Sequence, residues 1–171
     1  MRRVLLLVAV LGLVAGSAHA TPAGPAGTRA VSLEQELLQE LNEVRGTRGL
    51  RPLRLANGLQ TAAVGHSRSM LAGRFFAHES RDGTQMAERV RRLYPPLGGS
   101  WSVGENLIWA SPRLGAAQAV RAWLASPGHR RNMLAAGWRE VGIGAVRAVS
   151  PGGPFGSGTV VVVTMNFGAR G

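Results

Sequence analysis

The segment from Thr159 to Phe167 constrains the fold of this chain more than any other. It opens with one threonine and four valines in succession and ends in Met165-Asn166-Phe167. A run of β-branched residues favours a strand, and the lack of polar alternation indicates that both faces of that strand are covered. A second strand is predicted from Trp138 to Val146, where apolar residues alternate. We therefore expect a sheet with packed layers on both sides.

The helical patterns lie ahead of these two strands. Capping residues and apolar repeats predict helices that start near Ser32, Asn57, Thr84, Ser111 and Arg130. The first is the clearest, because Ser32 and Gln35 form a capping-box pair in front of an apolar repeat. Helices early and hairpin-linked strands late predict an α+β fold, with one antiparallel sheet between helical layers.

The first residues are typical of an export signal. Arg2 and Arg3 precede an aliphatic run from Val4 to Val14, and Ala18-His19-Ala20 fits a signal-peptidase site. The run is too short to span a bilayer comfortably. We expect a signal peptide over 1–20, a flexible lead-in over 21–31 and one domain over 32–171. The product is then secreted, extracellular or periplasmic, with no transmembrane segment after cleavage; an uncleaved membrane anchor is the alternative.

Composition narrows the class of partner. The chain carries 20 basic residues against 9 acidic ones, and every basic residue is arginine. These arginines are spread along the chain without a basic arm or an aromatic-basic repeat, which argues against a nucleic-acid partner. Anionic surfaces such as cell-wall polymers or lipid headgroups are the expected electrostatic partners of an exported basic protein. The chain has no cysteine, so it folds without disulfides, as is more usual in bacterial than in eukaryotic exported domains.

His129 and Glu105 stand out as candidate functional residues. Pro127 and Gly128 bend the chain, so His129 lies at or just before a helix N-terminus, where the helix dipole disfavours imidazolium. A neutral imidazole there is a base or a metal ligand, or else a surface cap. Glu105 lies among aliphatic residues and tryptophans, and it needs backbone donors, a cation or a metal as a partner. The alternative is a structural glutamate satisfied by loop amides. His66, on an apolar helical stripe, is expected to be a packing residue.

Several ordered motifs together resemble bacterial CAP-domain proteins. They are His66–Met70, Phe76–Ser80, Gly104–Leu107, Trp123 with Ser126–Leu134, Val141–Gly144 and Met165–Gly168. This superfamily groups cysteine-rich secretory proteins, antigen 5 and plant pathogenesis-related proteins. The resemblance covers Leu37 to Gly168, nearly the whole chain after the expected signal peptide.

The resemblance implies a single-domain α-β-α sandwich with a central cleft. In the family that cleft often carries two histidines and two acids, and it can hold a divalent metal, usually zinc. By motif, His78 matches the first histidine, Glu105 the first glutamate and His129 the second histidine. The second glutamate usually follows the helix tryptophan, whereas Trp123-Leu124-Ala125-Ser126 contains no acid.

The three matched residues also make chemical sense without the family. Two imidazoles and one carboxylate suffice for a zinc site with an open position for water. We expect His78, Glu105 and His129 to converge on one point. Glu105 is then either a third ligand or a group behind the ligands that orients a histidine or the water.

Two functions fit this pattern. The first is a binding module that recognises a cell-envelope component, a lipid or a protein through its cleft. The second is a zinc-dependent, peptidase-like hydrolase that uses His78, Glu105 and His129 for catalysis. The chain has no Gly-x-Ser-x-Gly motif and no cysteine nucleophile, so binding is the favoured interpretation.

Overall fold

The computed structural model describes residues 32–171; the signal peptide expected over 1–20 and the lead-in expected over 21–31 lie outside them. Four strands form one sheet in the order β1-β3-β4-β2. They are β1 (Arg54–Leu55), β2 (Trp101–Ala110), β3 (Glu140–Val149) and β4 (Thr159–Arg170). β4 pairs antiparallel with β2 and with β3, whereas the short β1 runs parallel to β3. The strand predicted from the valine run therefore lies inside the sheet, and β2 forms one of its edges.

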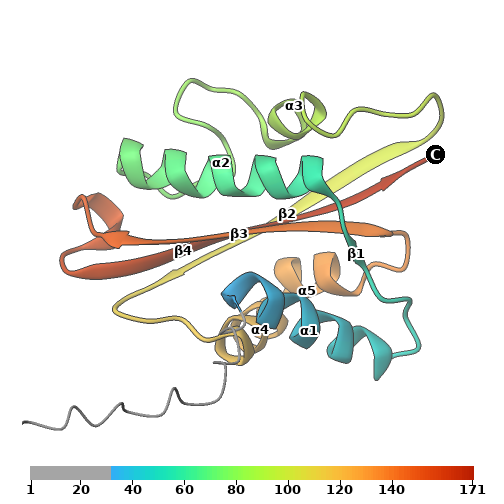
Figure 1. Ribbon diagram of the computed structural model, residues 1–171, viewed down its shortest axis with the longest axis horizontal. Coiled ribbons are helices and arrows are strands. Elements are labelled where there is room, and N and C mark those ends of the chain that lie inside the picture. Colours follow the sequence, from blue (N-terminus) through green and yellow to red (C-terminus); the bar gives the residue numbers. More distant parts are fainter. Residues whose placement is uncertain (1–31) are drawn as a thin grey trace, which may run out of the picture. The chain divides into compact units, whose positions relative to one another are not determined.

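Helices cover both faces of this sheet (Figure 1). They are α1 (Leu33–Gly46), α2 (Asn57–Gly73), α3 (Met86–Arg91), α4 (Ala116–Ala125) and α5 (Pro127–Leu134), with a 3₁₀ turn at Gly153–Phe155. In Figure 1, α2 and α3 lie on one face, and α1, α4 and α5 lie on the other. The predicted α+β class and the α-β-α sandwich are confirmed.

Buried apolar side chains fill both interlayer spaces. The larger cluster joins the sheet to α1, α4 and α5, and its largest members are Leu37, Leu41, Trp123, Met133, Ile143 and Phe167. Smaller clusters lie under α2 and α3, around Met70, Phe155, Leu59 and Tyr94. Burial of this apolar surface is the main force that holds the helices on the sheet.

Two glycines let α2 pack directly on β3. A Cβ atom built on Gly142 would lie 2.1 Å from the backbone carbon of Leu59, and one on Gly144 would lie 2.3 Å from the backbone nitrogen of Val64. No side chain fits in that space, so only glycine allows the helix backbone to lie so close to the strand. This contact explains the Val-Gly-Ile-Gly motif in terms of folding.

The strand β2 was not predicted from the sequence. Glu105 and Asn106 interrupt its apolar residues, so neither alternation nor a continuous apolar run is visible. The segment is nonetheless paired with β4 over ten positions, from Trp101 opposite Arg170 to Ala110 opposite Val161. Both polar residues are buried within this strand, at 4% and 0% exposure. The apolar pattern expected of a buried strand is broken at Glu105 and Asn106, because both polar side chains are buried together with hydrogen-bond partners.

Three predicted helix starts differ from those in the structure, the first of them by a single residue. Thr84 is not the cap of α3, because its carbonyl accepts from the backbone N–H of Ser80 at 2.9 Å in a closed turn, and the cap is Gln85. Pro112 does not open α4, because Gly115 is still extended at φ −96° and ψ 154°. α5 begins at Pro127, earlier than expected, with Ser126 as its cap. The capping box of α1 is confirmed.

We predict that Trp123→Ala lowers the free energy of unfolding by about 3–5 kcal/mol. The Trp123 side chain is 1% exposed, and its indole N–H donates to the carbonyl of Leu107 at 3.0 Å. Its removal leaves both a cavity between α4 and the sheet and an unpaired carbonyl. Urea unfolding measures the change, with Val149→Ala as the control, since Val149 is 81% exposed. A loss below about 1 kcal/mol for Trp123→Ala would contradict the packing described.

Candidate functional site

The candidate site is built around the buried carboxylate of Glu105. Its side chain is 1% exposed, although it comes from the edge strand β2. Oε1 lies 2.9 Å from Nδ1 of His78, and Oε2 lies 2.7 Å from Nη2 of Arg89. In the amide orientation that satisfies both of its polar atoms, Asn166 donates to the same Oε2 at 3.0 Å. The carboxylate of Glu105 is therefore paired with the side chains of His78, Arg89 and Asn166, and not with loop amides.

His78 is held by this carboxylate but remains accessible. Its side chain is 56% exposed. An ionised carboxylate only accepts hydrogen bonds, so Nδ1 of His78 carries the hydrogen and Nε2 keeps its lone pair. A carboxylate that accepts a hydrogen bond from one ring nitrogen of a histidine orients the ring, so that the other nitrogen can bind a ligand or a metal.

Arg89 was not identified from the sequence, and it connects three parts of the site. From α3, Nη2 donates to Glu105, and Nη1 donates to the carbonyl of His78 at 3.0 Å and to Oγ of Ser80 at 3.1 Å. This guanidinium thus compensates the buried carboxylate and fixes the backbone that presents His78. The sequence indicated that Glu105 needs a partner, but it offered many arginines and no means of choosing one.

Two asparagines place His129 beside β2. Asn106 donates from Nδ2 to the carbonyl of His129 at 3.1 Å. Asn132, one turn further along α5, donates to the carbonyl of Glu105 at 3.0 Å and to Oδ1 of Asn106 at 2.9 Å. These bonds hold the first turns of α5 on the edge strand β2. Asn106 and Asn132, which belong to two of the motifs that resemble the family, are therefore positioning residues.

A buried arginine fixes the other end of α5. Arg45, at 0% exposure, donates from Nη1 to the carbonyls of Met133 at 2.7 Å and Ala135 at 3.2 Å. Its Nε donates to the carbonyl of Arg51 at 2.9 Å. A positive charge at a helix C-terminus is favourable, because the last carbonyls there carry partial negative charge. α5 is thus held at both ends, and His129 with it.

His129 is half-buried, and it is the third residue of α5. Burial lowers its pKa below the usual histidine value, and a positive charge on the His78 ring, when that ring is protonated, lowers the pKa of His129 further. His129 is therefore neutral near pH 7. His78 comes from the loop ahead of α3, on one face of the sheet, and His129 comes from α5, on the other.

The expected three-ligand convergence has no support in the geometry. Within residues 32–171, no group of three His, Cys, Asp or Glu side chains is arranged to hold a metal ion. Both Glu105 oxygens face His78 and Arg89, and a guanidinium at 2.7 Å opposes a cation on that carboxylate. The two imidazoles are then the side chains left available to a metal, with Glu105 behind His78. Metal binding stays a prediction.

His66 is a packing residue, as predicted. It is 1% exposed in α2, Nε2 lies 2.9 Å from the carbonyl oxygen of Ala77, and Phe75 packs edge-on at 6.1 Å. Burial, the largest cause, lowers its pKa, and the charge of Arg89 also lowers it, whereas Glu105 acts in the opposite direction. The side chain of His66 is thus engaged by Ala77 and Phe75 inside the protein.

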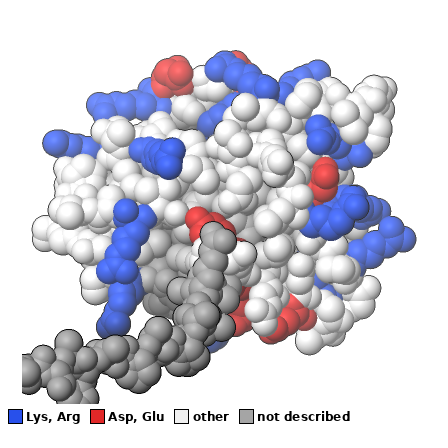
Figure 2. All heavy atoms as spheres, viewed as in Figure 1, with Lys and Arg blue, Asp and Glu red and all other residues white. Residues whose placement is uncertain are grey.

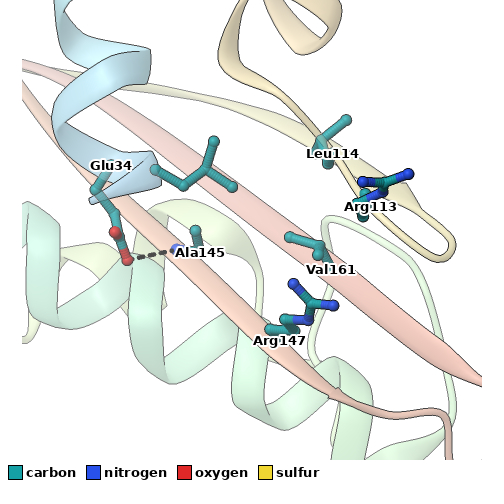
Figure 3. A pocket seen from close by; sticks show the side chains of 7 residues that line it. Glu34, Arg113, Leu114, Ala145, Arg147 and Val161 are labelled. Carbon is teal, nitrogen blue, oxygen red and sulfur yellow. Dashed lines mark hydrogen bonds between the residues drawn. The ribbon is translucent and has the colours of Figure 1, made fainter. Parts of the chain in front are cut away.

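A cavity lies away from His78, beside the first turn of α1 (Figure 3). Its volume is about 280 Å³. Leu114 and Val161 line its apolar part, and Arg113 and Arg147 point along its side. Glu34 reaches across to accept from the backbone N–H of Ala145 at 3.3 Å. That bond satisfies one donor on the free edge of β3.

The surface charge matches the expectation from composition. Figure 2 shows basic side chains scattered around the visible face, with no continuous basic stripe. Among the described residues, no helix combines the length and the apolar composition needed to cross a membrane.

Known sequences resemble most of the described chain. The model of the cysteine-rich secretory protein (CAP) family matches residues 38–167. The Bacillus subtilis (strain 168) membrane protein YlbC is 28% identical over 114 residues, which are 67% of this chain and 32% of YlbC. This chain thus spans about a third of the length of that curated relative.

Solved structures show the same fold. An extracellular protein containing a SCP domain from Bacillus anthracis str. Ames has a TM-score of 0.63 at 24% identity, covering 81% of this chain and 40% of that one. An outer surface protein from Borrelia burgdorferi has a TM-score of 0.60 at 21% identity, covering 82% of this chain and 97% of that one. Identities this low support the fold alone.

We predict that the buried His66 makes the protein less stable in acid. Its pKa is lower in the folded than in the unfolded chain, so below about pH 6.5 the unfolded chain binds the proton first. The free energy of unfolding then falls with decreasing pH, by up to about 1.4 kcal/mol per pH unit, until the folded-state pKa is passed. Urea unfolding from about pH 7.5 to about pH 5 of the wild type and of His66→Gln measures this slope. An equal slope in both proteins would contradict the prediction.

Proposed function

The chain belongs to the cysteine-rich secretory protein (CAP) family, and on that premise we propose that it is an exported binding domain. Its ligand is a component of the cell envelope, taken up at the edge of β2 between His78 and His129. The description of the Bacillus anthracis structure as an extracellular SCP-domain protein supports an exported setting. The excess of basic over acidic residues favours an anionic ligand.

The pairing of Glu105 is the observation that carries this proposal. A hydrolase of the zinc type uses three protein ligands and an open position for water, together with a general base. Here both oxygens of the one buried carboxylate are already occupied, by His78 and Arg89. The segment that usually supplies the family's second acid ends in Ser126, which makes no side-chain cap hydrogen bond. These contacts of Glu105 support binding over hydrolysis.

A divalent metal, with zinc as the first choice, fits the proposal as a weakly held partner of the two imidazoles. When bound, such an ion supplies a Lewis acid that attracts anionic groups and polarises water. The residues of this chain do the rest: Glu105 orients His78, and the asparagine clamp from Asn106 and Asn132 positions the backbone of His129.

Zinc titration by calorimetry on the purified protein tests the cleft. We expect one site, weakened about tenfold or more in His78→Ala and in His129→Ala, because each variant removes one of two ligands. Affinity should also fall on acidification, since protons compete for the imidazoles. Glu79→Gln is the matched control, an exposed acid next to His78 that should leave affinity unchanged.

Two outcomes would contradict the proposal. Zinc binding that survives His129→Ala would remove that residue from the site. Zinc-dependent hydrolysis of peptide or ester substrates, lost in a folded His129→Ala variant, would establish the hydrolase in place of the binding domain.

A further inference from the structure

Another cavity is lined by residues of α2, of the loop that follows His78 and of α3. It has a volume of about 340 Å³. Three guanidinium groups line it, from Arg81, Arg89 and Arg92, and the only acid among its lining residues is Asp82. Ser69, Ser80 and Thr84 add three hydroxyl groups. The lining is therefore basic and rich in hydrogen-bond donors, which is the chemistry that recognises an oxyanion.

These guanidiniums keep unused donors. Arg81 donates to one protein acceptor, the carbonyl of Gly73, and Arg92 to one, the carboxylate of Glu88, among residues 32–171. Each guanidinium has five N–H donors, so most of these remain available to a ligand. The pair between Arg92 and Glu88 is exposed, at 65% and 61%, and such a pair is held weakly.

Arg89 places a fixed positive charge at the wall of the cavity. Its side chain is 14% exposed, and its Nε is buried without a hydrogen-bond partner in the described part of the chain. A nitrogen buried this deeply is out of a ligand's reach, so Arg89 acts on a ligand in the cavity through its charge. The other two nitrogens of the same group already hold His78, Ser80 and Glu105.

The loop that forms one wall is closed on itself. Ser80 donates its backbone N–H to the carbonyl of Thr84 at 2.9 Å, and Gly83 donates to the carbonyl of Ser80 at 2.9 Å. One carboxylate oxygen of Asp82 accepts from the backbone N–H of Thr84 at 3.0 Å. Asp82 is thereby occupied within the loop, and its negative charge opposes only part of the positive charge of the wall.

We propose that this cavity binds a phosphate group, carried as a phosphate ester on a cell-envelope component. A phosphate has several acceptor oxygens in a tetrahedral arrangement, which suits three separate guanidiniums better than a single flat carboxylate does. The cavity is larger than a lone phosphate needs, so it also has room for the group to which the phosphate is esterified. This inference rests on the proposed function for its setting, because it names the ligand class.

The cavity is coupled to His78 through Arg89. The guanidinium that would meet the phosphate also contacts Glu105, and Glu105 contacts Nδ1 of His78. A bound phosphate group therefore changes the environment of the His78 ring without touching it.

Titration with inorganic phosphate and with glycerol 1-phosphate, followed by NMR of the Arg Nε and His ring signals, tests the proposal. We expect saturable shifts of Arg89 Nε and of His78, with glycerol 1-phosphate binding more tightly than inorganic phosphate. The double variant Arg81→Ala/Arg92→Ala should weaken binding about tenfold or more, as it removes two charge-assisted contacts. Arg113→Ala is the matched control, because Arg113 lines the other cavity, and it should bind phosphate as the wild type does.

Three results would overturn the proposal: equal losses in the double variant and in Arg113→Ala, undiminished binding in the double variant, or acetate binding as tightly as glycerol 1-phosphate. If inorganic phosphate and glycerol 1-phosphate bind equally tightly, the claim that the ligand is a phosphate ester is wrong, while the phosphate site itself stands. The double variant leaves His78 and His129 in place, so its zinc affinity should match the wild type. Loss of phosphate binding with zinc binding intact thus separates a failure of this inference from a failure of the proposed function.

Discussion

The candidate site depends on compensation of one buried charge, the carboxylate of Glu105. An unpaired carboxylate at 1% exposure would be strongly unfavourable, and its environment supplies a cation, an imidazole and an amide. Arg89 makes the closest of these contacts, and it also carries the His78 loop. The position of the exposed histidine is therefore a consequence of how the buried carboxylate is satisfied. Removing one partner of such a pair typically costs about 3–5 kcal/mol, so the site and the local fold are coupled.

The apolar parts of the fold were predictable from the sequence, whereas the polar contacts of the site were only partly so. The valine run of β4 and the capping box of α1 were identified correctly, because each has a local pattern with a direct physical cause. β2 was missed, because Glu105 and Asn106 are buried polar residues that disturb the strand pattern. His78 and Glu105 do meet, as expected, but Arg89 lies sixteen residues from Glu105, and no spacing rule links them.

Because the site lies at an edge of the sheet, its residues come from elements on both faces of the sheet. β2 has one neighbour, β4, so the opposite side is open to groups from both faces of the sheet. The His78 loop arrives with α3 from one face, and His129 arrives with α5 from the other, held by Asn106 and Asn132. At this edge His78 is exposed and His129 is half-buried, while the carboxylate of Glu105 is buried behind His78.

The tautomer of His78 tests this account most directly. Long-range ¹H–¹⁵N NMR on the histidine rings, at about pH 8 and so well above the ordinary histidine pKa, shows which ring nitrogen carries the hydrogen. The account predicts a hydrogen on Nδ1 of His78 and a bare Nε2, because Nδ1 lies 2.9 Å from a carboxylate oxygen that can only accept. A hydrogen found mainly on Nε2 would contradict it, since Glu105 would then not orient His78 and the site would need another explanation.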